Sequence, residues 1–277
     1  MKMDKKTKIV LINPPLSARQ VAGSLEKIAN IIPPLGIGYV AAVLKKAGFK
    51  VRIVDSVALR LDKEKIAEIP RKDEPDIIAF TATIMSIYSA IETAKYLRKV
   101  FPKAKLVLGG PQITSIPEQT MKPKVFDFGI LGEGEYTMLE LVEMVEAGKK
   151  NWSKIKSLVF WRGKKLVINP RREMIENLDI LPYPARELFP NQKYYHPMPG
   201  GYKRLPFGHM VTSRGCPYRC SFCDRSVFGN KFRARSPEKV IEEIEFLIKN
   251  YKVKEIKFYD DLFTKDKERV HKICDLI

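Results

Sequence analysis

The residues best suited to chemistry are Cys216, Cys220 and Cys223, three of the four cysteines in the chain. Their C-x3-C-x2-C spacing places three thiols on one short loop, as in proteins whose cysteines hold iron–sulfur clusters. Three thiolates can hold three corners of a [4Fe–4S] cluster and leave the fourth iron free to activate a ligand. The spacing therefore predicts a reactive cofactor at this loop.

A structural zinc site is the alternative for the same cysteines. Zinc takes four ligands in such sites, and the fourth would have to come from His209 or Cys274, neither of which stands at finger spacing. We expect Cys274 to be a buried helix cysteine that packs as a small apolar side chain. His209 is expected to be a strand residue beside the cluster, and His196 and His271 to be ordinary surface or linker residues.

The elements before the cysteines predict an α/β fold, because apolar runs alternate with amphipathic segments along residues 1–150. Such a pattern indicates a doubly wound parallel sheet of the Rossmann or flavodoxin type. Strands are expected at 8–13, 50–55, 76–81, 105–108 and 126–131, and helices at 33–46, 62–69, 85–100 and 135–147.

Small and Gly/Pro-rich segments follow four of these strands: 13–15, 81–83, 109–111 and 132–134. Ligands of such sheets bind beyond the carboxyl ends of the strands, and glycines there let backbone approach a ligand closely. The alternative is that these glycines only make turns, and that Glu133 and Glu135 are charges favoured at a helix N-terminus. No G-x-G-x-x-G follows the first strand, which argues against an ordinary dinucleotide site.

Beyond residue 150 the chain is expected to form a hairpin over 156–168, a Pro-rich linker up to 205, and the start of a second α/β domain over 206–277. In this last part, 209–213 and 254–259 are predicted strands, and helices should begin at Ser236 and near Lys265. The first of these helices should bury its apolar face, which consists of Val240, Ile241, Ile244, Leu247, Ile248 and Tyr251.

The segment Arg214-Gly-Cys-Pro-Tyr-Arg-Cys-Ser-Phe-Cys223 resembles the signature of the radical S-adenosylmethionine (SAM) enzymes. The resemblance implies that the three cysteines ligate a [4Fe–4S] cluster and that SAM chelates its fourth iron. Reduction by a donor such as ferredoxin or flavodoxin would then cleave SAM to a 5′-deoxyadenosyl radical. It also implies that Phe222 lies near the adenine and that Asp260 and Asp261 contact the SAM amino group. Neither aspartate belongs to a Gly-Gly-Glu motif, and both could instead be turn or capping carboxylates.

The first half is similar to the cobalamin-binding domain that precedes the radical SAM domain in the B12-dependent subgroup. The resemblance lies in the segments 13–15, 33–39, 109–112 and 132–135, in 182–186 of the linker and in 260–264. It implies cobalamin contacts from Asn13, Pro14, Pro15, Leu35, Gly36, Thr81, Thr83, Gly109, Gly110, Pro111, Gly132, Glu133 and Gly134. The chain lacks the Asp-x-His-x-x-Gly motif, and none of its three histidines lies in residues 1–150, so cobalamin would be bound without a histidine ligand.

The subgroup implies radical-based methyl transfer to an unactivated carbon of a small-molecule or peptide substrate. A B12-linked rearrangement or cyclisation is the alternative, whereas a tRNA-modifying methylthiotransferase is disfavoured because residues 1–215 contain no cysteine. Only about two strands of the radical SAM barrel are expected before Ile277. A C-terminally truncated protein or one half of a split enzyme is therefore also consistent, and we expect little SAM cleavage from this chain alone.

The composition is that of a globular cytoplasmic protein, with 45% hydrophobic and 30% charged residues and no apolar run long enough to span a bilayer. The net charge of +18 raises the possibility of a nucleic-acid partner. The lysines are spread along the chain, however, and no aromatic-basic recognition motif accompanies them, so a solvated basic surface is preferred. Salt-sensitive retention on an RNA or DNA column would distinguish the two.

Overall fold

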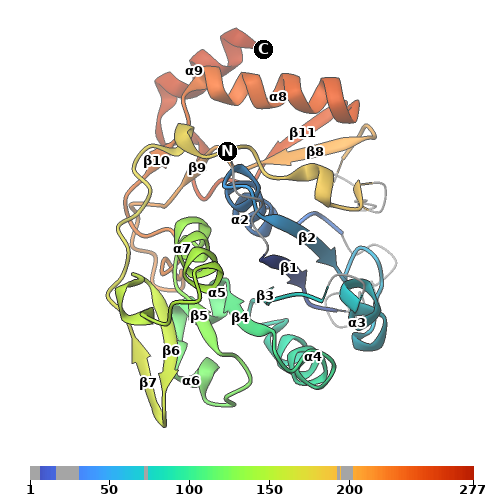
Figure 1. The fold of residues 1–277 in the computed structure, drawn as a ribbon. Helices are drawn as coiled ribbons and strands as arrows, with labels where there is room; N and C mark the ends of the chain where they lie inside the picture. Colours follow the sequence, from blue (N-terminus) through green and yellow to red (C-terminus); the bar gives the residue numbers. More distant parts are fainter. Residues whose placement is uncertain (1–6, 17–30, 72–73, 192–193, 195–201) are drawn as a thin grey trace.

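The N-terminal half forms a twisted, mostly parallel sheet, as predicted. We describe residues 7–16, 31–71, 74–191, 194 and 202–277 of a computed structural model (Figure 1). Five parallel strands are β1 (Lys8–Asn13), β2 (Lys50–Asp55), β3 (Ile77–Thr81), β4 (Lys105–Gly109) and β5 (Phe128–Ile130). Their order is β2-β1-β3-β4-β5, so the direction of winding reverses between β1 and β3. Ligands of doubly wound sheets bind at the carboxyl ends of the strands on either side of such a reversal.

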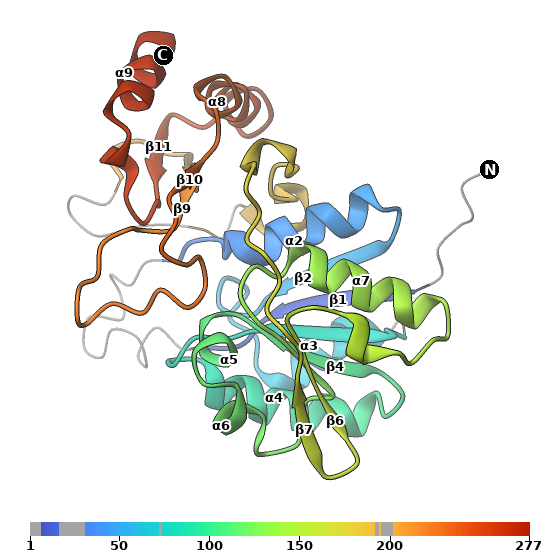
Figure 2. The ribbon, with the colours of Figure 1, turned by 90° about the vertical axis from the view of Figure 1, so that its left-hand side faces the viewer.

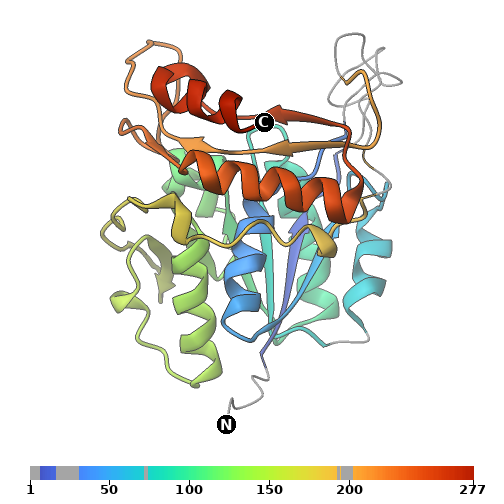
Figure 3. The same cartoon turned by 90° about the horizontal axis from the view of Figure 1, so that it is seen from above.

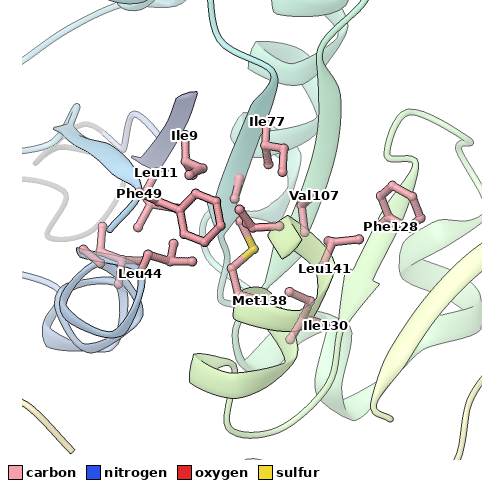
Figure 4. Close-up of a cluster of buried hydrophobic side chains, with 14 of the residues drawn as sticks. Ile9, Leu11, Leu44, Phe49, Ile77, Val107, Phe128, Ile130, Met138 and Leu141 are labelled. Carbon is pink, nitrogen blue, oxygen red and sulfur yellow. The ribbon is translucent and has the colours of Figure 1, made fainter. Parts of the chain in front are cut away.

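Helices cover both faces of this sheet because each strand alternates its buried side chains between two cores. On one face α2 (Leu35–Lys46) and α7 (Glu135–Glu146) pack on one set of strand residues. Figure 4 shows part of this core, where side chains of β1, α2 and α7 meet. On the other face α3 (Lys63–Arg71) and α4 (Ile87–Val100) bury the alternate set, which includes Val10, Ile12 and Ile78.

The hairpin expected over 156–168 is present and extends the main sheet. Strand β6 (Leu158–Arg162) pairs antiparallel with β5, and β7 (Lys165–Ile168) pairs antiparallel with β6. The sequence did not reveal two short helices between β4 and β5, α5 (Pro111–Ser115) and α6 (Pro117–Met121). Each has proline at its first position, where the missing N–H costs nothing. Single 3-10 turns lie at η2 (Trp152–Lys154), η3 (Leu178–Ile180), η4 (Arg186–Leu188) and η6 (Phe263–Lys265).

The C-terminal part is a smaller layer, which lies above α2 in Figures 1 and 2. Strand β8 (Phe207–Met210) pairs parallel with β11 (Glu255–Phe258), and β9 (Ser213–Arg214) pairs antiparallel with β10 (Arg233–Ala234). Helix α8 (Pro237–Tyr251) crosses the N-terminal part in Figure 3, and α9 (Lys267–Leu276) packs beside it. As expected, α8 is capped by Ser236, whose Oγ accepts the Lys239 amide at 3.3 Å.

Several expectations need correction. Ile248 is 51% exposed, because α8 turns Val240, Glu243 and Leu247 inward instead. Cys274 is exposed, since its neighbour Ile273 takes the buried side of α9.

Three element boundaries also differ from the prediction. The strand expected at 209–213 is divided into β8 and β9, because the Thr212 amide donates to the Asp260 carboxylate and not to a strand. Helix α3 continues past Pro70 to Arg71, and β5 is shorter than the predicted 126–131. His196 lies outside the described residues, whereas His271 is on the surface, as expected. None of the helices in the described ranges has both the length and the apolar character needed to cross a membrane.

Candidate functional site

A cavity of about 670 Å³ lies between the two parts of the chain. One wall consists of α2 and the carboxyl-end loops of the sheet, and the other consists of the cysteine loop and its neighbours, residues 211–229 together with Asp261. The volume is within the range of small-molecule and cofactor sites. The cavity therefore joins the two segments in which the sequence placed chemistry.

The sheet-side wall contains many of the residues expected from the sequence. Those that line the cavity are Leu35, Gly36, Thr81, Gly109, Gly110, Pro111, Glu133 and Gly134. A Cβ added at Gly36 would meet no atom within 4 Å, so it would project into open space. At Gly110, where φ is +97°, a Cβ would come within 2.8 Å of the Ala82 carbonyl oxygen. Glycine at the first position leaves the wall open, and glycine at the second lets two loops close together.

Other expected residues lie outside this wall. Asn13 donates its side-chain amide to Asp55 at 2.8 Å, and the Pro15 carbonyl accepts the Ser89 hydroxyl. The Thr83 amide donates to the Ser86 hydroxyl at 3.0 Å, where it helps to start α4. The cavity lining also lacks Pro14, Gly132, Cys220, Phe222 and Asp260.

The cysteine loop presents three free thiols. Cys216 is half-buried, whereas Cys220 and Cys223 are exposed. Cys216 and Cys223 both line the cavity. Phe222 is 91% exposed. Three thiols on one loop can supply three of the ligands of an iron–sulfur cluster. Within the described residues, no three His, Cys, Asp or Glu side chains are gathered closely enough to hold a metal ion. The ligand types therefore fit a cluster, although the three thiols do not converge on one point.

Asp260 and Asp261 hold the base of the cysteine loop. The Asp260 carboxylate accepts the Thr212 amide and hydroxyl, both at 2.6 Å, and the Ser213 hydroxyl at 2.7 Å. Asp261 accepts the Gly215 amide at 2.9 Å and also lines the cavity. These contacts are those of turn carboxylates, the alternative to a SAM contact for both aspartates. Asp261 also faces the cavity, where a ligand would lie.

No role was predicted for the arginines that flank the cysteine loop. Arg214 donates from Nη1 to Glu133 at 2.8 Å and from Nη2 to Glu135 at 2.6 Å. Arg233 donates to both oxygens of Glu133, at 2.9 and 3.0 Å. Burial alone would lower the pKa of Arg214, but Glu135 and Glu133 outweigh it and raise that pKa above its ordinary value. The two arginines and two glutamates thus form buried ion pairs, in which each group has a partner of opposite charge.

Tyr39 of α2 completes the buried contact between the two parts. Its hydroxyl donates to the Val211 carbonyl at 3.3 Å, and its ring lies 5.1 Å from the guanidinium of Arg214 and 5.7 Å from that of Arg235. Burial, reinforced by Glu243, raises the pKa of Tyr39 to about 12. The phenol is therefore neutral near pH 7 and acts as a hydrogen-bond donor, not as a base.

The arrangement suits a large organic cofactor held between an open glycine-lined wall and a thiol-bearing loop. The sheet side offers apolar side chains and backbone, and within the described residues no histidine lines the cavity. A corrinoid would therefore be held by shape and backbone contacts, with the cluster donors on the opposite wall.

Two family models match the chain, one for each wall of the cavity. Residues 12–142 match the B12 binding domain, and residues 210–276 match the radical SAM superfamily. The boundary between the two matches falls in the segment that holds the hairpin and the Pro-rich linker.

Curated relatives match nearly the whole of this chain. The chain is 37% identical over 269 residues to an uncharacterized methyltransferase, PH0819, of Pyrococcus horikoshii, covering 96% of this chain and 56% of the relative. It is 33% identical over 253 residues to the anaerobic magnesium-protoporphyrin IX monomethyl ester cyclase of Cereibacter sphaeroides, covering 90% of this chain and 40% of the relative. The chain thus spans about half the length of the curated relatives it matches.

Solved structures show the same fold. The methyltransferase TsrM from Kitasatospora setae, with tryptophan and a SAM analogue bound, matches with a TM-score of 0.75 at 20% identity, over 97% of this chain and 50% of that one. The cobalamin-dependent radical enzyme OxsB, with aqua-cobalamin and SAM bound, matches with a TM-score of 0.78 at 20% identity, over 97% of this chain and 36% of that one.

Proposed function

The chain belongs to the proteins that join a B12-binding domain to a radical SAM domain, and from this premise we propose that it binds cobalamin, a [4Fe–4S] cluster and SAM for radical-based methyl transfer to an unactivated carbon. The family binds these cofactors, and its members include methyltransferases and cyclases. The observation that supports the proposal best is the single cavity lined by both the strand-end glycines and two of the three cysteines.

In this proposal each wall has a separate task. Cys216, Cys220 and Cys223 would hold the cluster, and Gly36, the 109–111 turn and Gly134 would hold the corrinoid. When bound, the cluster with SAM supplies one-electron chemistry, and the cobalamin carries the methyl group. Asp261 and Arg214 fix the loop that brings the thiols to the edge of the cavity. An electron donor such as ferredoxin or flavodoxin belongs to the proposal.

Cyclisation is the second candidate, because the second relative described above is a cyclase. The methyltransferase reading is preferred because the relative with the higher identity is named as a methyltransferase. The two reactions require the same cofactors, so cofactor binding tests the class and a product assay then separates them.

The test is anaerobic reconstitution of the chain with iron, sulfide and hydroxocobalamin, followed by desalting and ultraviolet–visible spectroscopy. We expect an iron–sulfur shoulder together with retained corrinoid bands. Replacing Cys216, Cys220 and Cys223 with alanine should abolish the shoulder and leave the corrinoid bands. Gly36→Leu should do the reverse, because its side chain would fill open cavity space and weaken corrinoid binding by about tenfold or more.

Cys274→Ala is the matched control, since this cysteine is exposed and distant in the sequence from the loop. It should retain both spectral features. Loss of the corrinoid from the unmodified chain on desalting, with the shoulder retained, would overturn the cobalamin part of the proposal. Binding of zinc in place of iron by the three cysteines would overturn the cluster part.

A further inference from the structure

One buried carboxylate holds both ends of the cysteine loop. Arg214 precedes the loop in β9 and Arg233 follows it in β10, and the two residues are direct partners in the β9–β10 pair. Both donate to Glu133, at 2.8 Å from Arg214 and at 2.9 and 3.0 Å from Arg233. Arg214 and Arg233 stand at the two ends of the loop that carries all three predicted cluster ligands, and we call this pair the loop neck. The loop neck is therefore bound to a residue of the other wall.

Glu133 is itself fixed on the sheet side. It stands between Gly132 and Gly134 after β5, and its second oxygen accepts the Ile175 amide at 2.8 Å. The Glu133 side chain is only 4% exposed, and the side chains of Arg214 and Arg233 are 5% and 2% exposed. The carboxylate thus has a full set of donors, all supplied by the chain, and none of its bonds needs a bound ligand.

Arg214 uses the shape of its guanidinium to bridge two carboxylates. Nη1 reaches Glu133 while Nη2 reaches Glu135, the first residue of α7. A lysine ammonium carries the same charge, but it lacks the planar fork that sets two donors in fixed directions. The bridge therefore defines an orientation of the loop neck, and not only an attraction.

The backbone at the neck leaves little freedom. Gly215 has φ of +83°, and a Cβ there would lie 2.3 Å from the Lys231 carbonyl oxygen. Its amide is held by Asp261 at 2.9 Å. The two ends of the loop are therefore in close contact, and a shift of Arg214 would move the segment that begins at Cys216.

We propose that Glu133 is a positioning residue, which sets the cysteine loop over the sheet-side wall through Arg214 and Arg233 and does not act by contacting a cofactor. This inference rests on the proposed function, because the loop matters as the carrier of the cluster ligands. It assigns the 132–134 segment a role in aligning the two cofactor sites with one another.

The experiment compares hydrogen exchange of the cofactor-free and reconstituted chain for Glu133→Gln, Arg233→Lys and Arg214→Lys. Each substitution is close to the original in size, and each removes or distorts the shared contact. We expect amides in 211–235 to exchange about tenfold faster or more, with β1–β4 unchanged, since the opening is local. The Glu133→Gln/Arg233→Lys double variant should add little to Glu133→Gln, because both act through one contact.

The matched control is Glu176→Gln, which removes the 2.5 Å ion pair to Lys231 on the same loop. That pair is exposed, so its loss should leave exchange in the loop unchanged. The affinity for hydroxocobalamin is measured in parallel. Under the proposal, Glu133→Gln and Arg233→Lys lower the affinity for hydroxocobalamin by the same factor.

Two outcomes would overturn the inference. Weaker corrinoid binding in Glu133→Gln alone, with normal exchange in the loop, would make Glu133 a direct contact. Faster exchange spread uniformly over the sheet would make the contact a general stabiliser. Failure of the proposed function can be told apart from failure of this inference. In the first case the unmodified chain would retain no corrinoid or cluster. Hydrogen exchange in the cofactor-free variants would still show whether Glu133 positions the cysteine loop.

Discussion

His209 is a histidine whose surroundings favour the neutral ring. It lies on β8 with 3% of its surface exposed, and its Nε2 is 3.0 Å from the carbonyl oxygen of Pro33 on the other part of the chain. Its ring meets that of Tyr259 edge-on at 5.2 Å. Burial, with the positive charge of Arg186 adding to it, lowers the pKa of His209 to about 4, against a smaller opposing effect of the Pro33 carbonyl.

This histidine should make the free energy of unfolding depend on pH. In the unfolded chain its pKa is near 6.5, so between pH 6.5 and about 4 the unfolded state binds a proton that the folded state does not. The contribution of the neutral His209 ring to the free energy of unfolding is fully present above pH 6.5 and is lost as the pH falls towards 4. Lowering the pH from 7 to 5 should cost about 2 kcal/mol through this residue.

Urea unfolding of the chain and of His209→Gln at pH 7 and pH 5 measures the effect. Glutamine can still donate to the Pro33 carbonyl but does not titrate. The variant should therefore lose about 2 kcal/mol less than the original chain over this interval. Equal losses in both proteins would contradict the shifted pKa. Replacing the exposed His271 in the same way serves as the control and should leave the pH dependence unaltered.

At the scale of elements, two glycines on the cavity wall have opposite reasons to be glycine. Gly110 joins β4 to α5 with φ of +97°, and an added Cβ would crowd Thr81 and Ala82 at 2.8 Å. Gly36 is in the first turn of α2, where an added Cβ would meet nothing. The first is required by the fold, whereas no contact within the described residues requires the second.

Alanine substitutions should separate these roles. Gly110→Ala combines a left-handed backbone with a clash and should lower the free energy of unfolding by ~2–4 kcal/mol. Gly36→Ala should be neutral or stabilising by up to ~1 kcal/mol, because alanine is the better helix former. Thermal unfolding monitored by circular dichroism checks both. A stable Gly110→Ala protein would show that the β4–α5 turn can relax.

Elements with strong local signals could be predicted from the sequence, while contacts between distant segments could not. The apolar runs of β1 and β2 and the capped start of α8 agree with the structure to within a residue. The short helices α5 and α6 were missed, although Pro111 and Pro117 stand at their first positions, where proline is suited to start a helix.

The site shows the same division. The cysteine motif carries its own spacing, so its chemistry could be inferred from neighbours in the chain. The partners of Arg214 are 81 and 79 residues away, in a different part of the fold. Glu243 was also missed, because a glutamate in the middle of α8 gives no sign that Arg186 will make its burial possible. Ion pairs of this kind depend on how the two parts meet.

At the scale of the whole molecule, buried charge recurs along the contact between the two parts. Besides the pairs at the loop neck, Arg186 of the linker donates to Glu243 of α8 at 2.9 Å and to the His209 carbonyl at 2.7 Å. The side chains of the pair are 6% and 0% exposed. Apolar contacts alone would allow the layers to slide, whereas fixed charged partners select one alignment of the cavity walls.

Arg186→Met should therefore destabilise the protein strongly. It retains the length of the side chain but leaves Glu243 buried without its charge partner, which typically costs about 3–5 kcal/mol. Replacing both residues, as Arg186→Met/Glu243→Leu, should recover most of that loss, because no unpaired charge then remains. Urea unfolding gives the three free energies, and a double variant no more stable than Arg186→Met would contradict this account.

The neighbouring residue provides the control. Glu187 pairs with Lys45 of α2, but the two side chains are 51% and 40% exposed. Water screens such a pair, so Glu187→Gln should change the free energy of unfolding by less than ~1 kcal/mol. Arg186 and Glu187 each join the linker to a helix by an ion pair. Their substitutions would then differ severalfold in their effect on the free energy of unfolding, because only the Arg186 pair is buried. A large effect at Glu187 would mean that the linker depends on its total charge and not on the buried contact.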